Sequence, residues 1–190
     1  SRRLTTILMA DVVGYSRLMA VDEEGTLAQL KANRKELIVP KEKEYRGRTV
    51  KLMGDGVLME FGSVRDALNF AIDVQRAIIR RNRDIPDDQQ ISYRIGINIG
   101  DIITDGDDLY GGGINICARL ESICEPNGVF LTEDAYRQVD NSSNIRFRSL
   151  GKKKLKNIPG TVSIYQVLLD QSNSDIVSSP EWQTKPRKLN

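Results

Sequence analysis

The chain of 190 residues carries 28 lysines and arginines against 26 aspartates and glutamates, a net charge of +2, and 39% hydrophobic residues. This composition suits one domain with a core, and the balanced charge gives no reason to expect nucleic acid as the main partner. Histidine is absent. Its absence excludes Ser-His-Asp and Cys-His catalysis and imidazole-bound zinc. The chemistry must therefore depend on carboxylates, lysine, arginine, amides, or a metal that prefers oxygen ligands, such as Mg²⁺ or Mn²⁺.

Apolar runs in the chain are short, and no signal-peptide pattern opens it. We therefore expect a cytoplasmic domain without membrane contact. Cys117 and Cys124 are too few for a disulfide framework or a thiolate zinc site. Because they lie in an amphipathic segment, both are expected in the core.

Hydrophobic spacing and turn residues predict the following elements. They are, in chain order, a strand over 4–13, a helix over 23–45, a hairpin of strands 49–53 and 57–61, a helix over 63–78, a strand over 92–100, a helix over 114–121, a strand over 128–132, a helix over 133–139, and strands over 145–150 and 162–168. Pro40 is expected to kink or break its helix. In the hairpin, the Asp-Gly pair of Asp55 and Gly56 is expected to supply the positive φ of the turn.

This order predicts an α+β fold with a ferredoxin-like βαββαβ core and additional C-terminal strands. The sheet is expected to be mainly antiparallel, with helices packed on one face. The domain is expected to span residues 1–169, followed by a polar tail or linker over residues 170–190.

The strand over residues 92–100 alternates apolar residues with Arg94, Gly96 and Asn98. One face is therefore expected to be buried, while the other offers a cation and an amide. Asn115 and Arg119, four residues apart in a later helix, are expected to share one helical face.

Two aspartates occupy equivalent places in the predicted sheet. Asp11 ends the first strand and Asp55 lies at the tip of the hairpin. In a βαββ arrangement these strands are neighbours, so both carboxylates can reach one edge. Taken singly, Asp11 could simply end a strand and Asp55 could simply form a turn. Together they predict a site for two divalent ions roughly 3.5–4 Å apart.

Three segments resemble motifs of the class III nucleotidyl (adenylyl and guanylyl) cyclase catalytic domains, bacterial type. They are Met-Ala-Asp-Val-Val-Gly-Tyr-Ser over 9–16, Lys-Leu-Met-Gly-Asp-Gly-Val-Leu-Met-Glu-Phe over 51–61, and Asp-Leu-Tyr-Gly-Gly-Gly-Ile-Asn-Ile-Cys-Ala-Arg-Leu-Glu over 108–121. The resemblance extends over residues 5–168 in the family's order. Any one of these motifs alone would be a weak signal, whereas three in order are highly specific.

The resemblance implies that a ribose 3′-hydroxyl attacks the α-phosphate of a nucleoside triphosphate, which gives a 3′,5′-cyclic nucleotide and pyrophosphate. It also implies a role for each matching residue. The implied residues are Asp11, Asp55 and the Val12 carbonyl as metal ligands, the backbone amides of residues 13–16, including Gly14, Tyr15 and Ser16, at the β- and γ-phosphates, Arg94 at the phosphates, Lys51 and Asp108 at the purine, Asn115 at the ribose, and Arg119 at the phosphoryl group in the transition state.

Lys51 and Asp108 together indicate ATP as the substrate. A lysine can donate to adenine N1 and an aspartate can accept from the 6-amino group, whereas guanine presents a carbonyl and an N–H at these positions. Guanylyl cyclases of the family usually carry Glu and a small Cys or Ser instead. The alternative for Lys51 is an outward-facing strand residue without a function. The expected product is cyclic AMP, a second messenger.

One implied residue has no unique position. The family's triphosphate-binding lysine lies in the final hairpin, where Lys152, Lys153, Lys154 and Lys156 compete. Lys156 is favoured, and a solvated basic turn is the alternative. The glycine triplet over residues 111–113 is also richer in glycine than the usual motif.

The resemblance further implies a head-to-tail homodimer with two sites at its interface. Asp11, Asp55 and Arg94 of one chain would face a second group of residues from the partner. This group is Lys51, Asp108, Asn115 and Arg119. Regulatory domains are expected elsewhere in a longer chain.

Two rival functions make different demands on the sequence. A pseudo-cyclase that only binds nucleotide or dimerises would have lost a catalytic position, and every confidently placed one is present. A diguanylate cyclase would show a Gly-Gly-Asp/Glu-Glu-Phe hairpin, whereas residues 54–58 read Gly-Asp-Gly-Val-Leu.

Overall fold

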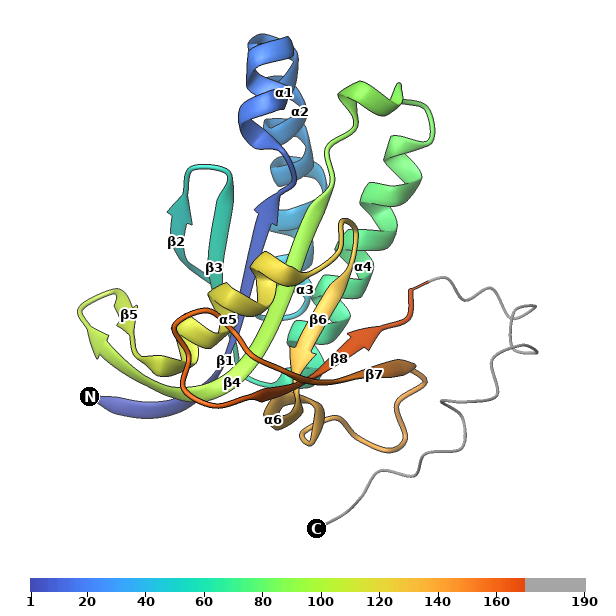
Figure 1. The fold of residues 1–190 in the computed structure, drawn as a ribbon. Coiled ribbons are helices and arrows are strands. Elements are labelled where there is room, and N and C mark those ends of the chain that lie inside the picture. Colours follow the sequence, from blue (N-terminus) through green and yellow to red (C-terminus); the bar gives the residue numbers. More distant parts are fainter. Residues whose placement is uncertain (170–190) are drawn as a thin grey trace.

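The computed structural model describes residues 1–169, which form an eight-stranded sheet with helices (Figure 1). The strands are β1 (Arg2–Val12), β2 (Arg48–Met53), β3 (Gly56–Phe61), β4 (Tyr93–Asp105), β5 (Asp108–Tyr110), β6 (Val129–Thr132), β7 (Phe147–Lys153) and β8 (Val162–Val167). The helices are α1 (Tyr15–Val21), α2 (Glu23–Asn33), the π-helical turn η1 (Arg34–Ile38), α3 (Val39–Glu44), α4 (Val64–Asn82), the 3₁₀ turn η2 (Asp87–Gln89), α5 (Gly112–Ile123) and α6 (Glu133–Tyr136).

The strands follow the order β2-β3-β1-β4-β6-β8-β7, and β5 pairs with β4. All pairings are antiparallel except that of β4 with β6. The mixed α+β fold and the mainly antiparallel sheet are confirmed. β1 lies between β3 and β4, so the residues at its end have a neighbour on each side.

Helices cover both faces of the sheet, which differs in one respect from the expected arrangement. α4 packs on the face that carries Leu8, Ile95 and Ile97, in the large core cluster. α5 packs on the other face, where its Cys117 lies in a cluster with Ile7 and Met9. α5 crosses in front of the sheet in Figure 1.

A glycine explains how α5 comes so close. A Cβ at Gly96 would lie 2.9 Å from the Glu121 nitrogen and 3.1 Å from the Cys117 carbonyl oxygen, so any side chain there would push the helix away. The same packing corrects the expected role of Asn98. Its amide does not face a ligand but is buried, where it donates to the Gly113 carbonyl (3.0 Å) and accepts from Thr132 (2.7 Å).

The expected long helix over residues 23–45 is continuous but changes its winding. Asp22 caps α2 by accepting from the Gly25 N–H (3.0 Å). The π-helical turn η1 then precedes α3, and Pro40 lies in the first turn of α3. Proline is tolerated there because a residue in the first turn of a helix needs no N–H donor, and because the wider π-helical turn before it changes the hydrogen-bond pattern at this point. Pro40 therefore does not break the helix. The short helix α1 was not predicted.

The hairpin between β2 and β3 is confirmed, but its positive φ lies elsewhere than predicted. Gly54, the residue before Asp55, adopts φ 59°. Gly56 already pairs with Asp11 of β1, and a Cβ on it would lie 3.0 Å from the Ala10 carbonyl oxygen. The glycine after Asp55 thus allows the two strands to approach, and the glycine before it makes the turn.

Cys117 and Cys124 are free and buried, as predicted.

Within residues 1–169, none of the helices combines the length and the apolar character needed to cross a bilayer.

Candidate active site at the end of β1

Asp11 and Asp55 lie side by side where β1 and the β2–β3 hairpin end. Asp11 pairs with Gly56, the residue after Asp55, and the Val12 N–H donates to the Asp55 carbonyl (3.3 Å). These backbone contacts fix the two carboxylates next to each other. The sheet therefore brings together the two acids that the sequence placed at one edge.

The Asp55 carboxylate destabilises the charge on Asp11. Burial and the neighbouring Asp55 carboxylate together raise the pKa of Asp11 to about 6, although the Val12 N–H and Arg94 lower it. Oδ1 of Asp11 is buried, and no hydrogen-bond partner for it exists in residues 1–169. Both side chains accept hydrogen bonds when ionised, so neither satisfies the other. Such a pair is stabilised by a cation.

Arg94 is a cation beside Asp11, where its charge lowers the pKa of that carboxyl. It stands directly opposite Asp11 on β4, where the register pairs the two residues. Its Nε is buried and finds no partner in the described part of the chain. A guanidinium that is held in place but unpaired is available to an anionic ligand.

Glu121 of α5 is a third carboxylate at this site, and the sequence analysis did not identify it. Glu121 as a whole residue is only 8% exposed to solvent. Burial, together with the Asp11 and Asp55 charges, raises the pKa of Glu121 to about 7, although Arg94 lowers it. A signal was present in the sequence, because Glu121 occupies a position of the buried stripe formed by Cys117, Leu120 and Cys124.

The donor set fits hard divalent ions. In residues 1–169, no group of three or more His, Cys, Asp or Glu side chains has the arrangement of a metal site. Two carboxylates and a backbone carbonyl can nevertheless hold Mg²⁺ or Mn²⁺ when water or a substrate supplies the remaining oxygens. The buried, unpaired Oδ1 of Asp11 supports this use, and Val12 follows Asp11 directly.

The loop after β1 turns sharply into α1. Gly14 adopts φ 64°, and a Cβ there would lie 3.5 Å from Nε of Arg17, which folds over it. The Val13 amide, which the resemblance also places at the phosphates, instead donates to the Ser92 carbonyl (2.8 Å). Tyr15 and Ser16 begin α1, and neither their backbone amides nor that of Gly14 donates a tertiary hydrogen bond within residues 1–169. Free amides and a nearby guanidinium suit a phosphate.

Asn115 and Arg119 lie on α5, as predicted, with Asn115 exposed and Arg119 half-buried. The buried positions Gly113, Cys117 and Leu120 hold the helix on the sheet. In residues 1–169, no hydrogen bond or ion pair joins Asn115 or Arg119 to Asp11 or Asp55. Within residues 1–169, these two parts of the predicted site therefore make no polar contact with each other.

Lys51 and Asp108 lie on two hairpins that contact each other, β2–β3 and β4–β5. Lys51 is exposed, and Asp108 accepts a hydrogen bond from the Tyr110 hydroxyl (3.2 Å). The β4–β5 hairpin itself was not predicted, because β4 extends to Asp105 rather than to Gly100.

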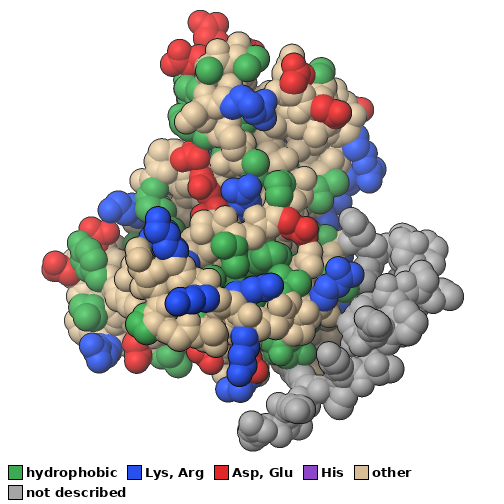
Figure 2. All heavy atoms as spheres, in the orientation of Figure 1, with side chains coloured by type: hydrophobic (Ala, Val, Ile, Leu, Met, Phe, Trp, Pro, Cys, Tyr) green, Lys and Arg blue, Asp and Glu red, His purple; other side chains and the backbone are tan. Residues whose placement is uncertain are grey.

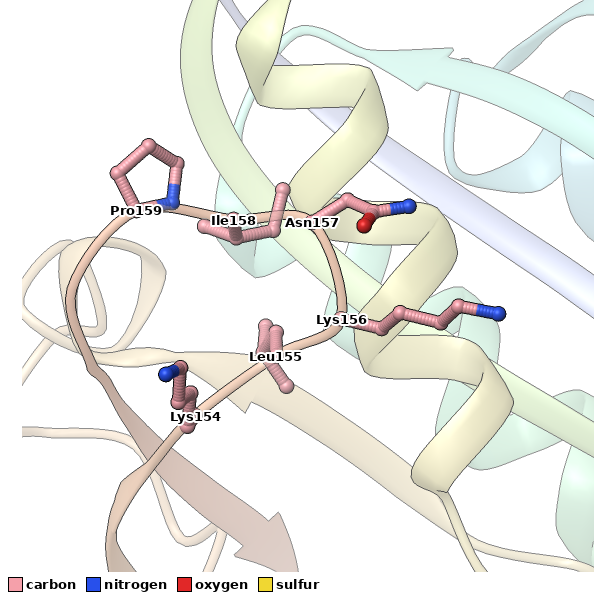
Figure 3. Close-up of a pocket in the computed structure, with 6 residues that line it drawn as sticks. All are labelled: Lys154, Leu155, Lys156, Asn157, Ile158 and Pro159. Atoms are coloured by element: carbon pink, nitrogen blue, oxygen red, sulfur yellow. The ribbon is translucent and has the colours of Figure 1, made fainter.

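The basic run divides between β7 and the loop that follows it. Lys152 and Lys153 end β7, whereas Lys154 and Lys156 flank the buried Leu155. Figure 3 shows that Lys154 and Lys156 point in different directions. Leu155 belongs to a cluster with Leu120 and Cys124 of α5, so the loop packs against the helix that carries Arg119. Lys156 thus lies close to that helix.

Figure 2 shows the face on which α5 lies, and basic side chains are spread over its lower part. A face of this kind suits a polyanionic ligand.

Residues 2–169 match the family model described as the adenylate and guanylate cyclase catalytic domain. The chain is 43% identical over 164 residues to "Putative adenylate cyclase 3" of Rhizobium meliloti, which covers 86% of this chain and 28% of that protein. It is 28% identical over 141 residues to an adenylate cyclase of Streptomyces coelicolor, covering 72% of this chain and 34% of that one. The chain thus spans about a third or less of these relatives' length.

Among solved structures, an adenylate/guanylate cyclase/hydrolase from Silicibacter pomeroyi superposes with a TM-score of 0.81 at 39% identity, over 90% of this chain and 99% of that one. The adenylyl cyclase CyaB from P. aeruginosa superposes with a TM-score of 0.74 at 23% identity, over 88% and 95% of the two chains. The second likeness concerns the fold.

Proposed function

Since the chain belongs to the adenylate and guanylate cyclase catalytic-domain family, we propose that it converts ATP to 3′,5′-cyclic AMP and pyrophosphate at sites shared between two copies of the chain. The observation that carries the proposal is the acid pair Asp11 and Asp55 at the position of the family's metal motif, in which Oδ1 of Asp11 is buried without a partner and Asp11 stands opposite Arg94. The relatives named adenylate cyclase support ATP rather than GTP.

Each residue at the end of β1 has a task in this reaction. Asp11, Asp55 and the Val12 carbonyl would hold two divalent ions, whose chemistry would be to activate the ribose 3′-hydroxyl and to neutralise the phosphates. The amides of Gly14, Tyr15 and Ser16 bind the β- and γ-phosphates, and Arg94 contributes a fixed positive charge. Lys156 is not at the end of β1; it contacts the triphosphate from the loop that packs on α5, together with the α5 residues of its own chain.

Residues on α5 and on the two hairpins complete the site from the partner chain. Asn115 orients the ribose and Arg119 stabilises the charge that develops on the phosphoryl group. Lys51 and Asp108 read the adenine edge. Within residues 1–169, none of these groups forms a hydrogen bond or ion pair with the acid pair, which agrees with this division of roles.

The surface around these residues suits a second copy of the chain. Large apolar side chains are exposed on the hairpins, the end of β4 and α5. They are Leu52, Met53, Ile103, Tyr110 and Ile123. An exposed apolar surface that surrounds half of a site fits a two-fold, head-to-tail dimer.

A product assay tests the activity. The protein is incubated with Mn²⁺ and either ATP or GTP, and the products are separated by chromatography. Cyclic AMP is expected from ATP. A protein that binds ATP without forming product would be a pseudo-cyclase, and a linear or cyclic dinucleotide from GTP would indicate a diguanylate cyclase.

Mixing two inactive variants tests the shared site. Arg119→Ala should lose on the order of 10²–10³ in rate, and Asp11→Ala should be inactive for lack of a metal ligand. After subunit exchange half of the dimers are hybrids, each with one intact site, so activity should return to about a quarter of wild type. A mixture that stays inactive despite proven exchange would refute the shared site.

A further inference from the structure

Among residues 1–169, Glu121 is a charged group beside Asp11 and Asp55 for which the proposed reaction has no task. We propose that Glu121 is a positioning residue whose negative charge balances Arg94, so that the acid pair keeps the net charge that divalent ions need. The inference rests on the proposed function, because it concerns the same metal site.

The register of the sheet places Glu121 next to this cluster. Arg94 and Gly96 are two residues apart on β4 and therefore point to the same face, about 7 Å apart along the strand. Asp11 stands opposite Arg94, and Met9 stands opposite Gly96. The backbone of Glu121 lies directly on Gly96, at 2.9 Å from the position of its missing Cβ. Gly96 thus brings the carboxylate of α5 close to the end of β1.

Within residues 1–169, the largely buried Glu121 residue has no hydrogen-bond or ion-pair partner that would explain a glutamate at this place. The residue is 8% exposed. Within residues 1–169, its carboxylate takes part in no hydrogen bond and no ion pair. Its electrostatic neighbours are Asp11, Asp55 and Arg94. A buried glutamate that neither caps a helix nor pairs within the core is costly unless the site uses its charge.

Counting charges shows what that use is. Asp11 and Asp55 contribute two negative charges, and Arg94 offsets one of them. With Glu121 ionised, the cluster returns to a net charge of −2 while Arg94 keeps its place for the phosphates. Without Glu121, the guanidinium would repel incoming divalent ions and would be drawn toward the aspartates.

This account predicts opposite effects from two neutral substitutions. Glu121→Gln preserves the shape of the side chain and removes its charge, so Mn²⁺ should bind about tenfold more weakly. Arg94→Gln should tighten Mn²⁺ binding by a similar factor. The double variant Arg94→Gln, Glu121→Gln should return to within about threefold of wild type, because the two charges cancel.

The experiment measures Mn²⁺ binding by electron paramagnetic resonance of the free ion, without nucleotide, at pH 8.5. Glu60→Gln is the matched control, since Glu60 is also 8% exposed but lies at the other end of β3, and it should leave Mn²⁺ binding unchanged. Glu121→Asp, which keeps the charge, should bind within about threefold of wild type. If Glu121→Gln does not fold, Glu121→Asp and Arg94→Gln still decide.

Wild-type affinity in Glu121→Gln, or a double variant as weak as that single variant, would overturn the inference. An Mn²⁺ affinity that Asp11→Asn leaves intact would refute instead the metal site of the proposed function.

Discussion

Two clusters of charged side chains, each built around carboxylates, lie at opposite ends of the β1–β3 pair. One surrounds Glu60 and the other contains Asp11 and Asp55, and they differ in how the carboxylate charge is compensated. At one end, Glu60 accepts hydrogen bonds from Arg3, from Arg48 (2.7 Å) and from Thr5 (2.8 Å). Burial alone would raise the pKa of Glu60, but these bonds outweigh it and lower the pKa to about 2. At the other end, burial and like charge raise the pKa of Asp11 to about 6.

The comparison teaches how to separate a structural acid from a binding acid in one sheet. Glu60 faces two guanidiniums and one hydroxyl that the protein itself supplies, so its charge is satisfied in the folded chain. The acids at the end of β1 share a single arginine and leave a buried oxygen unpaired. Because unsatisfied charge costs folding free energy, its persistence indicates a ligand that supplies the missing positive charge.

The largest expected difference is in activity. Asp55→Asn should lower the rate of cyclic AMP formation by on the order of 10³ or more, because a metal ligand is lost while the turn remains. Glu60→Gln should retain the rate within about twofold. Initial rates at saturating Mn²⁺ and ATP measure both. Similar rates in the two variants would remove the distinction between the clusters.

The comparison extends to the groups that read the base. Lys51 is exposed and takes part in no ion pair within residues 1–169, so it is available to a ligand. Replacing Lys51 by Glu and Asp108 by Cys should lower the preference for ATP over GTP by on the order of 10², because a mismatched polar pocket rejects its former base. The ratio of kcat/KM for the two nucleotides is the measurement. An unchanged ratio would mean that these residues do not contact the base.

For the free energy of unfolding, the order of the two clusters should be reversed, so that the substitution at Glu60 has the larger effect. Glu60→Gln should lower the free energy of unfolding by about 1–3 kcal/mol, since it removes charge-assisted hydrogen bonds and leaves Arg3 and Arg48 without an anion. Asp11→Asn should leave the stability unchanged or raise it in metal-free buffer, because it removes repulsion from Asp55. Urea unfolding at pH 7 measures both. A destabilised Asp11→Asn would show that the acid pair supports the fold.

The sequence could predict much of this molecule because local signals and the fold agree. The apolar run before Asp11 and the glycines around Asp55 suffice to place two acids at one sheet edge. What it missed depends on packing between distant segments. The approach of α5 to Gly96 determines that Asn98 is structural and that Glu121 faces the site, and neither follows from the spacing within one element. The choice among the four lysines of the final hairpin depends likewise on Leu155, which anchors the loop on α5.

The smallest expected effect is the slope of stability against pH, which should have opposite signs for the two clusters. The folded-state pKa of Glu60 lies below its ordinary value of 4.5, so its contribution is present above pH 4.5 and is lost as the pH falls toward 2. The pKa of Asp11 rises from 3.8 to about 6, so the folded state binds this proton more tightly than the unfolded state. Metal-free stability should therefore decrease as the pH rises from about 4 to about 6.

Difference curves between the wild type and each variant isolate these slopes from those of other carboxylates. The difference in unfolding free energy between the wild type and Asp11→Asn should change by on the order of 1 kcal/mol between pH 4 and 6, a value that allows for solvent screening. The corresponding difference for Glu60→Gln should change only below about pH 4.5. Saturating Mn²⁺ should abolish the change for wild-type Asp11, because the ion binds the ionised pair and replaces the proton. A slope between pH 4 and 6 that persists in Asp11→Asn would assign it to other groups, of which Glu121, whose pKa is raised to about 7, is the nearest.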